Sequence, residues 1–169
     1  MRRILVTGAS GCGKSTLAKE LARRLQITLV ETDPLYWEKN WKPTDTQVVI
    51  ERVTVAIAKD EWVLDGNFTS ERARVWAKAD TLIWLDYPRW LVLQRVASRN
   101  LVWLITQEEV WSGNRMTWSR AWSGVRHSMK SFDEKSVNYP RYFAEFPNLN
   151  VMRLRSPQET TRWLASLKE

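Results

Sequence analysis

The feature that most constrains this chain is the octapeptide Gly8-Ala9-Ser10-Gly11-Cys12-Gly13-Lys14-Ser15, which matches the P-loop pattern Gly-x4-Gly-Lys-Ser. The apolar run before it, residues 3–7, predicts a buried strand. The residues after it, 14–25, predict a helix with leucines on one face. In this setting the glycines let backbone N–H groups converge on phosphate oxygens, and the helix N-terminus adds about half a positive charge. The octapeptide is therefore predicted to bind nucleotide phosphates.

Three side chains of this segment have separate expected roles. Lys14 is expected to bridge the β- and γ-phosphates of ATP, and the Ser15 hydroxyl to bind Mg²⁺. Thr16 is expected to touch the α-phosphate. We interpret Cys12 as a small packing residue, because the pattern requires no thiol at that position. ATP as donor and Mg²⁺ are thus the predicted cofactors.

Predicted strands and helices alternate along the rest of the chain, which is typical of an α/β fold with a parallel sheet. A chain of 169 residues without internal repeats or low-complexity linkers predicts one domain over residues 1–169. The expected strands are 3–7, 27–31, 61–64, 81–85 and 149–154. The expected helices are 14–25, 43–59, 70–77, 88–103 and 157–167, with a mostly helical segment reaching about residue 132.

Composition bounds the environment and the partners. The N-terminus lacks a secretory apolar segment, no run approaches the ~18 apolar residues of a membrane span, and there is a single cysteine. A cytoplasmic location and no membrane partner are therefore expected. The formal net charge is +7, and the segment 89–126 holds six arginines but only two acidic residues. This excess predicts an anionic ligand, with a nucleic acid as the alternative to a nucleotide.

Three aspartates follow predicted strands and so lie at the sheet edge where ligands bind in parallel α/β folds. Asp65 is the candidate to hold Mg²⁺ through water, and its alternative role is a turn before glycine. Asp33 is the candidate to orient an acceptor hydroxyl or take its proton, unless it only begins a turn or caps a helix. Asp86 is expected to be structural.

The arginine-rich segment offers charge stabilisation for phosphoryl transfer. Arg95 and Arg99 are four residues apart and share a helix face, while Arg115 and Arg120 lie in a following segment that could close over the nucleotide. Tryptophans interleaved with these arginines could instead serve as stacking platforms for a nucleic acid. We favour packing inside the protein, because three of them are spaced along one helix face: Trp111, Trp118 and Trp122.

These motifs resemble the adenylate-kinase-like family of small P-loop kinases, especially its members described as DNA topology modulation proteins. The resemblance is carried by the P-loop, by segments 64–66 and 85–88, by the Arg95/Arg99 pair and by Gly113-Asn114-Arg115. It implies a P-loop NTPase fold of three α/β/α layers, with a five-stranded parallel sheet of order 2-3-1-4-5. It also implies an acceptor-binding region at about 32–60 and an arginine-rich helical lid at about 100–126. Arg95 and Arg99 match the lid-hinge arginines that meet the base and phosphates of ATP in this family.

The acceptor side departs from the nucleotide kinases of this family. Those enzymes follow Asp-Gly with Phe-Pro-Arg, whereas this chain has Asn67-Phe68-Thr69. Arg72 or Arg74 could replace the missing arginine and keep a nucleotide acceptor. Otherwise a nucleoside or another hydroxyl compound is implied. The residues expected at this acceptor are Asp33, Tyr36, Trp37, Trp41, Asn67 and Arg72.

The leading hypothesis is therefore Mg²⁺-dependent phosphoryl transfer from ATP to a small molecule, with Lys14, Asp33, Arg99, Arg115 and Arg120 as catalytic candidates. One alternative is a nucleotide-responsive DNA-binding protein. Another is a nucleotide sensor without turnover, which would tolerate the loss of Asp33.

Overall fold

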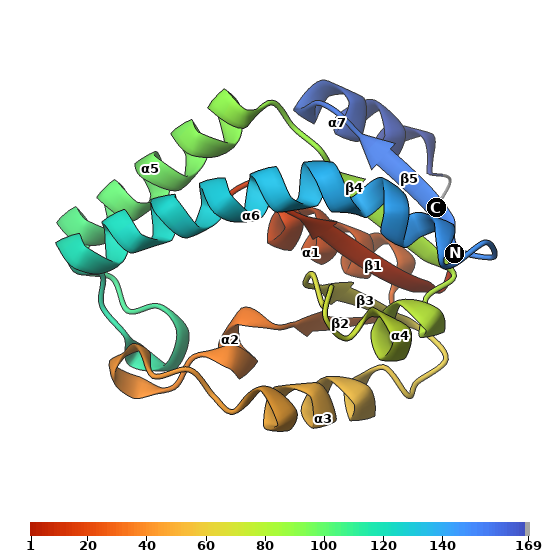
Figure 1. The fold of residues 1–169 in the computed structure, drawn as a ribbon, viewed down its shortest axis with the longest axis horizontal. Coiled ribbons are helices and arrows are strands. Elements are labelled where there is room, and N and C mark those ends of the chain that lie inside the picture. Colours follow the sequence, from red (N-terminus) through yellow and green to blue (C-terminus); the bar gives the residue numbers. More distant parts are fainter. Residues whose placement is uncertain (168–169) are drawn as a thin grey trace.

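The computed structural model describes residues 1–167 and consists of a central parallel sheet with helices on both faces (Figure 1). The strand order is β2-β3-β1-β4-β5, which confirms the predicted order 2-3-1-4-5. β1 lies between its two partners so that Val6 is level with Asp65 of β3 and Ile83 of β4. The strands are β1 (Arg3–Gly8), β2 (Thr28–Glu31), β3 (Trp62–Asp65), β4 (Thr81–Leu85) and β5 (Asn150–Leu154).

The helices connect these strands in the expected alternation. α1 begins at Lys14 and ends at Leu25, as the leucine spacing predicts. α7 begins at the Ser156 N-cap, whose side chain accepts a hydrogen bond from the Glu159 backbone N–H. The remaining helices are α2 (Asp33–Tyr36), α3 (Thr46–Ala56), α4 (Arg72–Val75), α5 (Arg89–Thr106), α6 (Trp118–Ala144) and α7 (Pro157–Ser166). Short 3-10 turns are η1 (Lys39–Trp41), η2 (Trp76–Lys78) and η3 (Trp111–Gly113).

Alternating side chains of the strands build two separate cores, one on each face of the sheet. Ile4 and Val6 of β1 pack with α1 in the first core. Leu5 points the other way and packs with Val53 of α3 and Tyr139 of α6 in the second. Strands buried on both faces read as continuous apolar runs, and β1, β3 and β4 do so.

Helix α6 is longer than the sequence predicts, because it continues past residue 132 to Ala144. Its C-terminal half packs Tyr139 and Phe143 against Trp76 and Trp84 on the second face of the sheet. These aromatic residues stand among polar and charged neighbours with Pro140 inside the helix, so the aliphatic spacing that identified α1 is missing. The long helix therefore brings residues far downstream back to the P-loop.

The predicted packing of the tryptophans is wrong for two of the three. Trp118 and Trp122 are 77% and 67% exposed at the start of α6. Trp111 lies in η3, where its ring contacts those of Trp41 and Trp103 edge-on. Figure 1 shows α5 and α6 side by side, joined by a loop that reaches α2. We call this connection, residues 107–117, the lid loop.

Candidate functional site

The P-loop bends sharply around the start of α1. Its glycines Gly8, Gly11 and Gly13 have backbone φ angles of +148°, +86° and +102°. A Cβ atom at Gly11 would lie 2.3 Å from a methyl carbon of Val96, so the loop also packs closely on α5. The Lys14 ammonium donates a hydrogen bond to the Ala9 carbonyl oxygen across the loop, at 3.1 Å. The loop thus has the shape and charge of a phosphate cradle.

Asp65 stands beside the loop at the end of β3, where Lys14 and Ser15 act on its carboxyl group. Burial raises the pKa of its carboxyl group, while the Lys14 ammonium and a hydrogen bond from the Ser15 side chain lower it. The second carboxylate oxygen, Oδ1, is buried and has no hydrogen-bond partner in the described chain. A buried carboxylate oxygen without a partner, next to a serine hydroxyl, fits Mg²⁺, which prefers oxygen ligands. Residues 1–167 contain no cluster of three or more histidine, cysteine or acidic side chains that could hold a metal.

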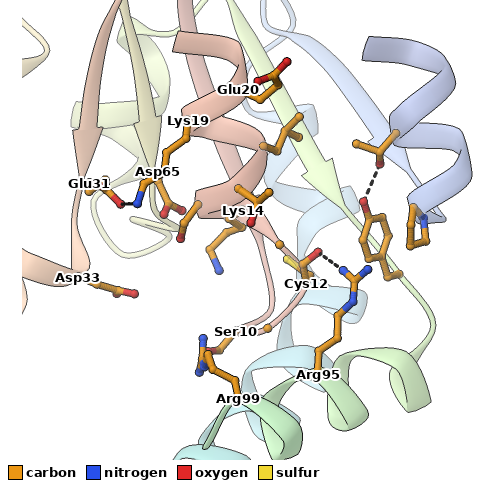
Figure 2. Close-up of a pocket in the computed structure, with 18 of the residues that line it drawn as sticks. Ser10, Cys12, Lys14, Lys19, Glu20, Glu31, Asp33, Asp65, Arg95 and Arg99 are labelled. Atoms are coloured by element: carbon orange, nitrogen blue, oxygen red, sulfur yellow. Dashed lines mark hydrogen bonds and ion pairs between the residues drawn. The ribbon is translucent and has the colours of Figure 1, made fainter. Parts of the chain in front are cut away.

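Arg95 and Arg99 of α5 point toward the P-loop, as Figure 2 shows. Arg95 donates to the Cys12 carbonyl oxygen at 3.2 Å. The Arg99 guanidinium lies 4.8 Å from the Trp103 ring centre, with one terminal nitrogen 3.5 Å from the Ser10 hydroxyl. Its Nε is buried without a partner in the described chain, and burial lowers the pKa of Arg99. Such an unsatisfied N–H donor fits an anionic oxygen.

Two cavities meet at this point. The first, which we call the P-loop cavity, has a volume of about 990 Å³ and includes Thr16, Arg95, Lys19 and Glu31 in its walls. The second, the aromatic cavity, has a volume of about 400 Å³. Its ring-bearing wall comprises Tyr36, Trp37, Trp41, Trp103 and Trp111. The residues that line both cavities are Ser10, Lys14, Asp33, Asp65, Arg99, Trp103 and Trp111.

Asp33 faces this junction from the first turn of α2. The N-cap position of α2 belongs to Thr32, and no hydrogen bond or ion pair of the Asp33 carboxylate is found within residues 1–167. Its charge is felt by both neighbours, since it raises the pKa of Asp65 and opposes the lowering of the pKa of Arg99. The carboxylate is therefore free to accept a proton or a hydrogen bond from a ligand.

The lid loop lines the aromatic cavity through Trp111 and Met116 and is tied to the region around Trp41. Asn114 is the anchor: its side-chain oxygen accepts from the Trp41 backbone N–H at 2.7 Å, and its amide donates to the Glu38 carbonyl oxygen at 2.8 Å. The Trp41 indole N–H donates to the Arg115 carbonyl oxygen at 2.9 Å. The residues Gly113-Asn114-Arg115, which the sequence ties to a family resemblance, therefore fasten the lid loop to the region around Trp41.

A family model described as an AAA domain matches residues 3–109, which is more than half of the chain. This protein belongs to the AAA domain family. An uncharacterized protein YqaC of Bacillus subtilis (strain 168) is 28% identical over 103 residues, covering 58% of this chain and 56% of the relative. A cytidylate kinase of Alkaliphilus oremlandii (strain OhILAs) is 30% identical over 82 residues, covering 43% of this chain and 38% of the relative.

The chain therefore spans only 56% and 38% of the lengths of these two curated relatives. The family match, the cytidylate kinase and the strand order together confirm the resemblance to adenylate-kinase-like small P-loop kinases. No helix within residues 1–167 combines the length and the apolar character that crossing a membrane requires.

Asn67 of the AAA domain supports the P-loop rather than extending freely toward an acceptor. Its side-chain oxygen accepts from the Gly8 backbone N–H at 3.1 Å and from the Thr7 hydroxyl at 2.8 Å. The Thr7 hydroxyl is also 2.6 Å from the Tyr139 hydroxyl of α6. The carbonyl oxygen of Asn67 accepts from the Trp76 indole N–H at 2.9 Å. Asn67 also lines the aromatic cavity, although its hydrogen bonds are to the P-loop strand and to Trp76.

Two predicted arginines do not reach the site. The Arg72 guanidinium pairs with Glu145 at 2.7 Å and stacks on Tyr142, outside both cavities, which corrects the expectation that it binds the acceptor. Arg115 is exposed and pairs with Glu109 at 3.0 Å, so its side chain is not at the junction either. Arg120 does line the aromatic cavity and lies over the Trp37 and Trp41 rings, about 6 Å from each ring centre.

Helix α6 contributes side chains that the sequence does not single out. The Ser128 hydroxyl donates to the Ser10 carbonyl oxygen of the P-loop at 2.7 Å. His127 and Ser131 line the aromatic cavity, although the sequence gives His127 no role. His127 and Ser131 are four residues apart and so share a helix face, which is the only sign of a common role that the sequence contains. This spacing does not indicate that the face contacts a loop more than a hundred residues earlier.

Proposed function

We propose that this protein transfers the γ-phosphoryl group of ATP to a hydroxyl group of a small molecule held in the aromatic cavity. The observation that carries the proposal is the junction of the two cavities. Lys14, Asp33, Asp65 and Arg99 line both of them, so a nucleotide in one and an acceptor in the other would meet between these side chains. The similarity to a cytidylate kinase supports the same reaction class.

Each side chain at the junction has a role in this reaction. Backbone N–H groups of the P-loop and the Lys14 ammonium hold the phosphates, and Arg99 donates to oxygens that gain charge during transfer. Asp33 orients the acceptor hydroxyl and receives its proton as the new P–O bond forms and the bond to ADP breaks. Ser15 and Asp65 would hold Mg²⁺, which neutralises phosphate charge when bound. Trp111 and Met116 of the lid loop line the aromatic cavity and would help to exclude water from it around a bound acceptor.

The test is an assay of ATP-dependent phosphorylation over a panel of nucleosides, nucleotides and sugars, with Mg²⁺. We expect at least one acceptor to be phosphorylated. In Asp33→Asn, the rate should fall about 10²- to 10⁴-fold at unchanged ATP affinity, because only the proton acceptor is removed. Asp60→Asn alters an exposed carboxylate outside both cavities and should match the wild type.

Acceptor-independent slow hydrolysis across the whole panel would refute the proposal. A nucleotide sensor without turnover would give a different pattern, because its output would survive Asp33→Asn.

A second candidate function, nucleotide-responsive nucleic-acid binding, is favoured by the exposure of Trp118 and Trp122 beside the arginine-rich segment. It predicts single-stranded DNA binding that weakens steeply with salt and is lost in the double variant Trp118→Ala/Trp122→Ala. Absence of binding at ~150 mM salt would eliminate it. Loss of DNA binding with intact phosphoryl transfer would show that the two activities are separate.

A further inference from the structure

One face of α6 forms the wall of the aromatic cavity opposite the rings. The residues on this wall follow one another at intervals of one, three or four positions, as residues on one helix face do. They are Arg120, Ser123, Gly124, His127 and Ser131. None of them is acidic, whereas the facing wall offers aromatic rings. A ligand that fits this cavity has a flat ring toward α2 and hydrogen-bond acceptors toward α6.

Lys135 lies one helical turn beyond Ser131. Its ammonium group contacts the Ser131 hydroxyl oxygen, and Ser131 is only 9% exposed. No ion pair joins Lys135 to an acidic side chain within residues 1–167. Burial and the like charge of Lys14 lower the pKa of Lys135 to about 8, although the neighbouring Glu134 acts in the other direction. A partly buried ammonium beside a second cation is unfavourable until an anion approaches it.

The missing anion belongs on the acceptor side rather than the donor side. Lys135 itself lines neither cavity, but Ser131, the group that it contacts, lines the aromatic cavity and not the P-loop cavity. The arginines that could have served an acceptor anion, Arg72 and Arg74, are paired with Glu145 and Glu71 instead. The position that carries an arginine in related nucleotide kinases is Thr69 in this chain.

We propose that Lys135 and Ser131 bind an anionic group of the acceptor, which is therefore a flat-ring compound carrying a phosphate or a carboxylate. This inference rests on the proposed function of the aromatic cavity. Lys135 donates a charge-assisted hydrogen bond to the anion, and the Ser131 hydroxyl donates a second one. The anion sits at Ser131 beside Lys135, while Lys14 stays with the ATP phosphates.

Binding measurements test the proposal without turnover. The probes are a nucleoside, its 5′-monophosphate and its 5′-carboxylate, added to protein saturated with a non-hydrolysable ATP analogue and followed by tryptophan fluorescence or calorimetry. We expect one or both charged forms to bind at least about tenfold more tightly than the neutral nucleoside. The charged form with the larger gain in affinity over the neutral nucleoside identifies the anion as phosphate or carboxylate.

The decisive variant is Lys135→Gln. It should abolish the preference for the charged form while the affinities for the neutral nucleoside and the ATP analogue stay unchanged. Lys135→Arg keeps the charge and should restore part of the preference, which a purely structural role would not explain. Lys130→Gln is the matched control, because Lys130 is an exposed lysine of the same helix that pairs with Glu134 at 3.8 Å.

Three results would overturn the proposal: no preference for charged ligands in the wild type, a preference that survives Lys135→Gln, or an equal loss of ATP-analogue affinity in that variant. The last result would assign Lys135 to the ATP site. If the charged ligands bind through Lys135 but no phosphoryl transfer occurs, the anion site stands and the proposed function fails. If transfer occurs to a neutral acceptor, the function stands and this inference fails.

Discussion

Replacing Asn67 with alanine removes the side-chain oxygen that ties β3 to the P-loop. Three donors lose this acceptor: the Gly8 backbone N–H at 3.1 Å, the Thr7 hydroxyl at 2.8 Å and the Tyr139 hydroxyl at 3.4 Å. Thr7 keeps a partner because its hydroxyl lies 2.6 Å from that of Tyr139. Gly8 is buried, so its backbone donor loses the hydrogen bond from Asn67 at a place that solvent does not reach. Such a donor destabilises a fold by about 1–3 kcal/mol.

The same change should weaken nucleotide binding, because Gly8 begins the P-loop and its N–H direction is set by Asn67. We expect Asn67→Ala to lower the free energy of unfolding by about 1–3 kcal/mol. We also expect ATP to bind about tenfold more weakly while adenosine, which lacks phosphates, binds as in the wild type. Urea denaturation measures the first effect and calorimetric titration the second.

The matched control is Asn138→Ala, since Asn138 is a partly buried residue of α6 whose side chain forms no hydrogen bond within residues 1–167. It should change the free energy of unfolding by less than about 0.5 kcal/mol. Our reasoning about Asn67 is refuted if Asn67→Ala has the stability of the wild type, or if its affinities for ATP and adenosine fall by the same factor.

Three further predictions concern separate parts of the chain. Ser156→Ala removes the N-cap of α7 and should lower the free energy of unfolding by about 1 kcal/mol in urea denaturation. Gly11→Ala puts a methyl group 2.3 Å from Val96 at a φ of +86°, so calorimetry should find ATP affinity reduced at least about tenfold. The pKa of Lys135 is about 8 in the fold and about 10.4 unfolded, so the unfolded state binds more protons between these values. The Lys135 contribution to stability should therefore rise from pH 8 to 10, and comparison with Lys135→Gln at both pH values isolates it from the titration of Cys12.

The parts of this protein that follow from sequence are those whose causes are local. α1 begins and ends where the leucine spacing and the P-loop glycines predict, because both signals lie within the helix and its N-terminus. Arg95 and Arg99 were assigned to one helix face by their spacing, and both reach the loop. The strand order came from a family resemblance, since spacing alone does not choose among parallel topologies.

The parts that the sequence did not reveal depend on contacts between distant segments. Tyr139 meets Thr7 across 132 positions, and Ser128 meets Ser10 across 118. No periodicity in either segment points to the other. The exposure of Trp118 has the same origin, because helical spacing shows that residues share a face but not whether another element covers that face. Arg72 was assigned to the acceptor for its charge, and only the fold shows that Glu145 already neutralises it.

The departure at Asn67 links these observations into one explanation of the acceptor site. The position that carries an arginine in related kinases, the third after Asp-Gly, is Thr69 in this chain and offers an acceptor no cation, while Asn67 two residues earlier serves the P-loop. In the proposed arrangement α6 supplies that cation through Lys135. The same helix begins at the end of the lid loop and lines the cavity with Arg120. An acceptor anion bound to α6 would stabilise one position of the helix that follows the lid loop. Acceptor binding and lid closure would then favour each other. Opening of the lid loop should accordingly be slower with the charged ligand than with the neutral one, and Lys135→Gln should remove that difference.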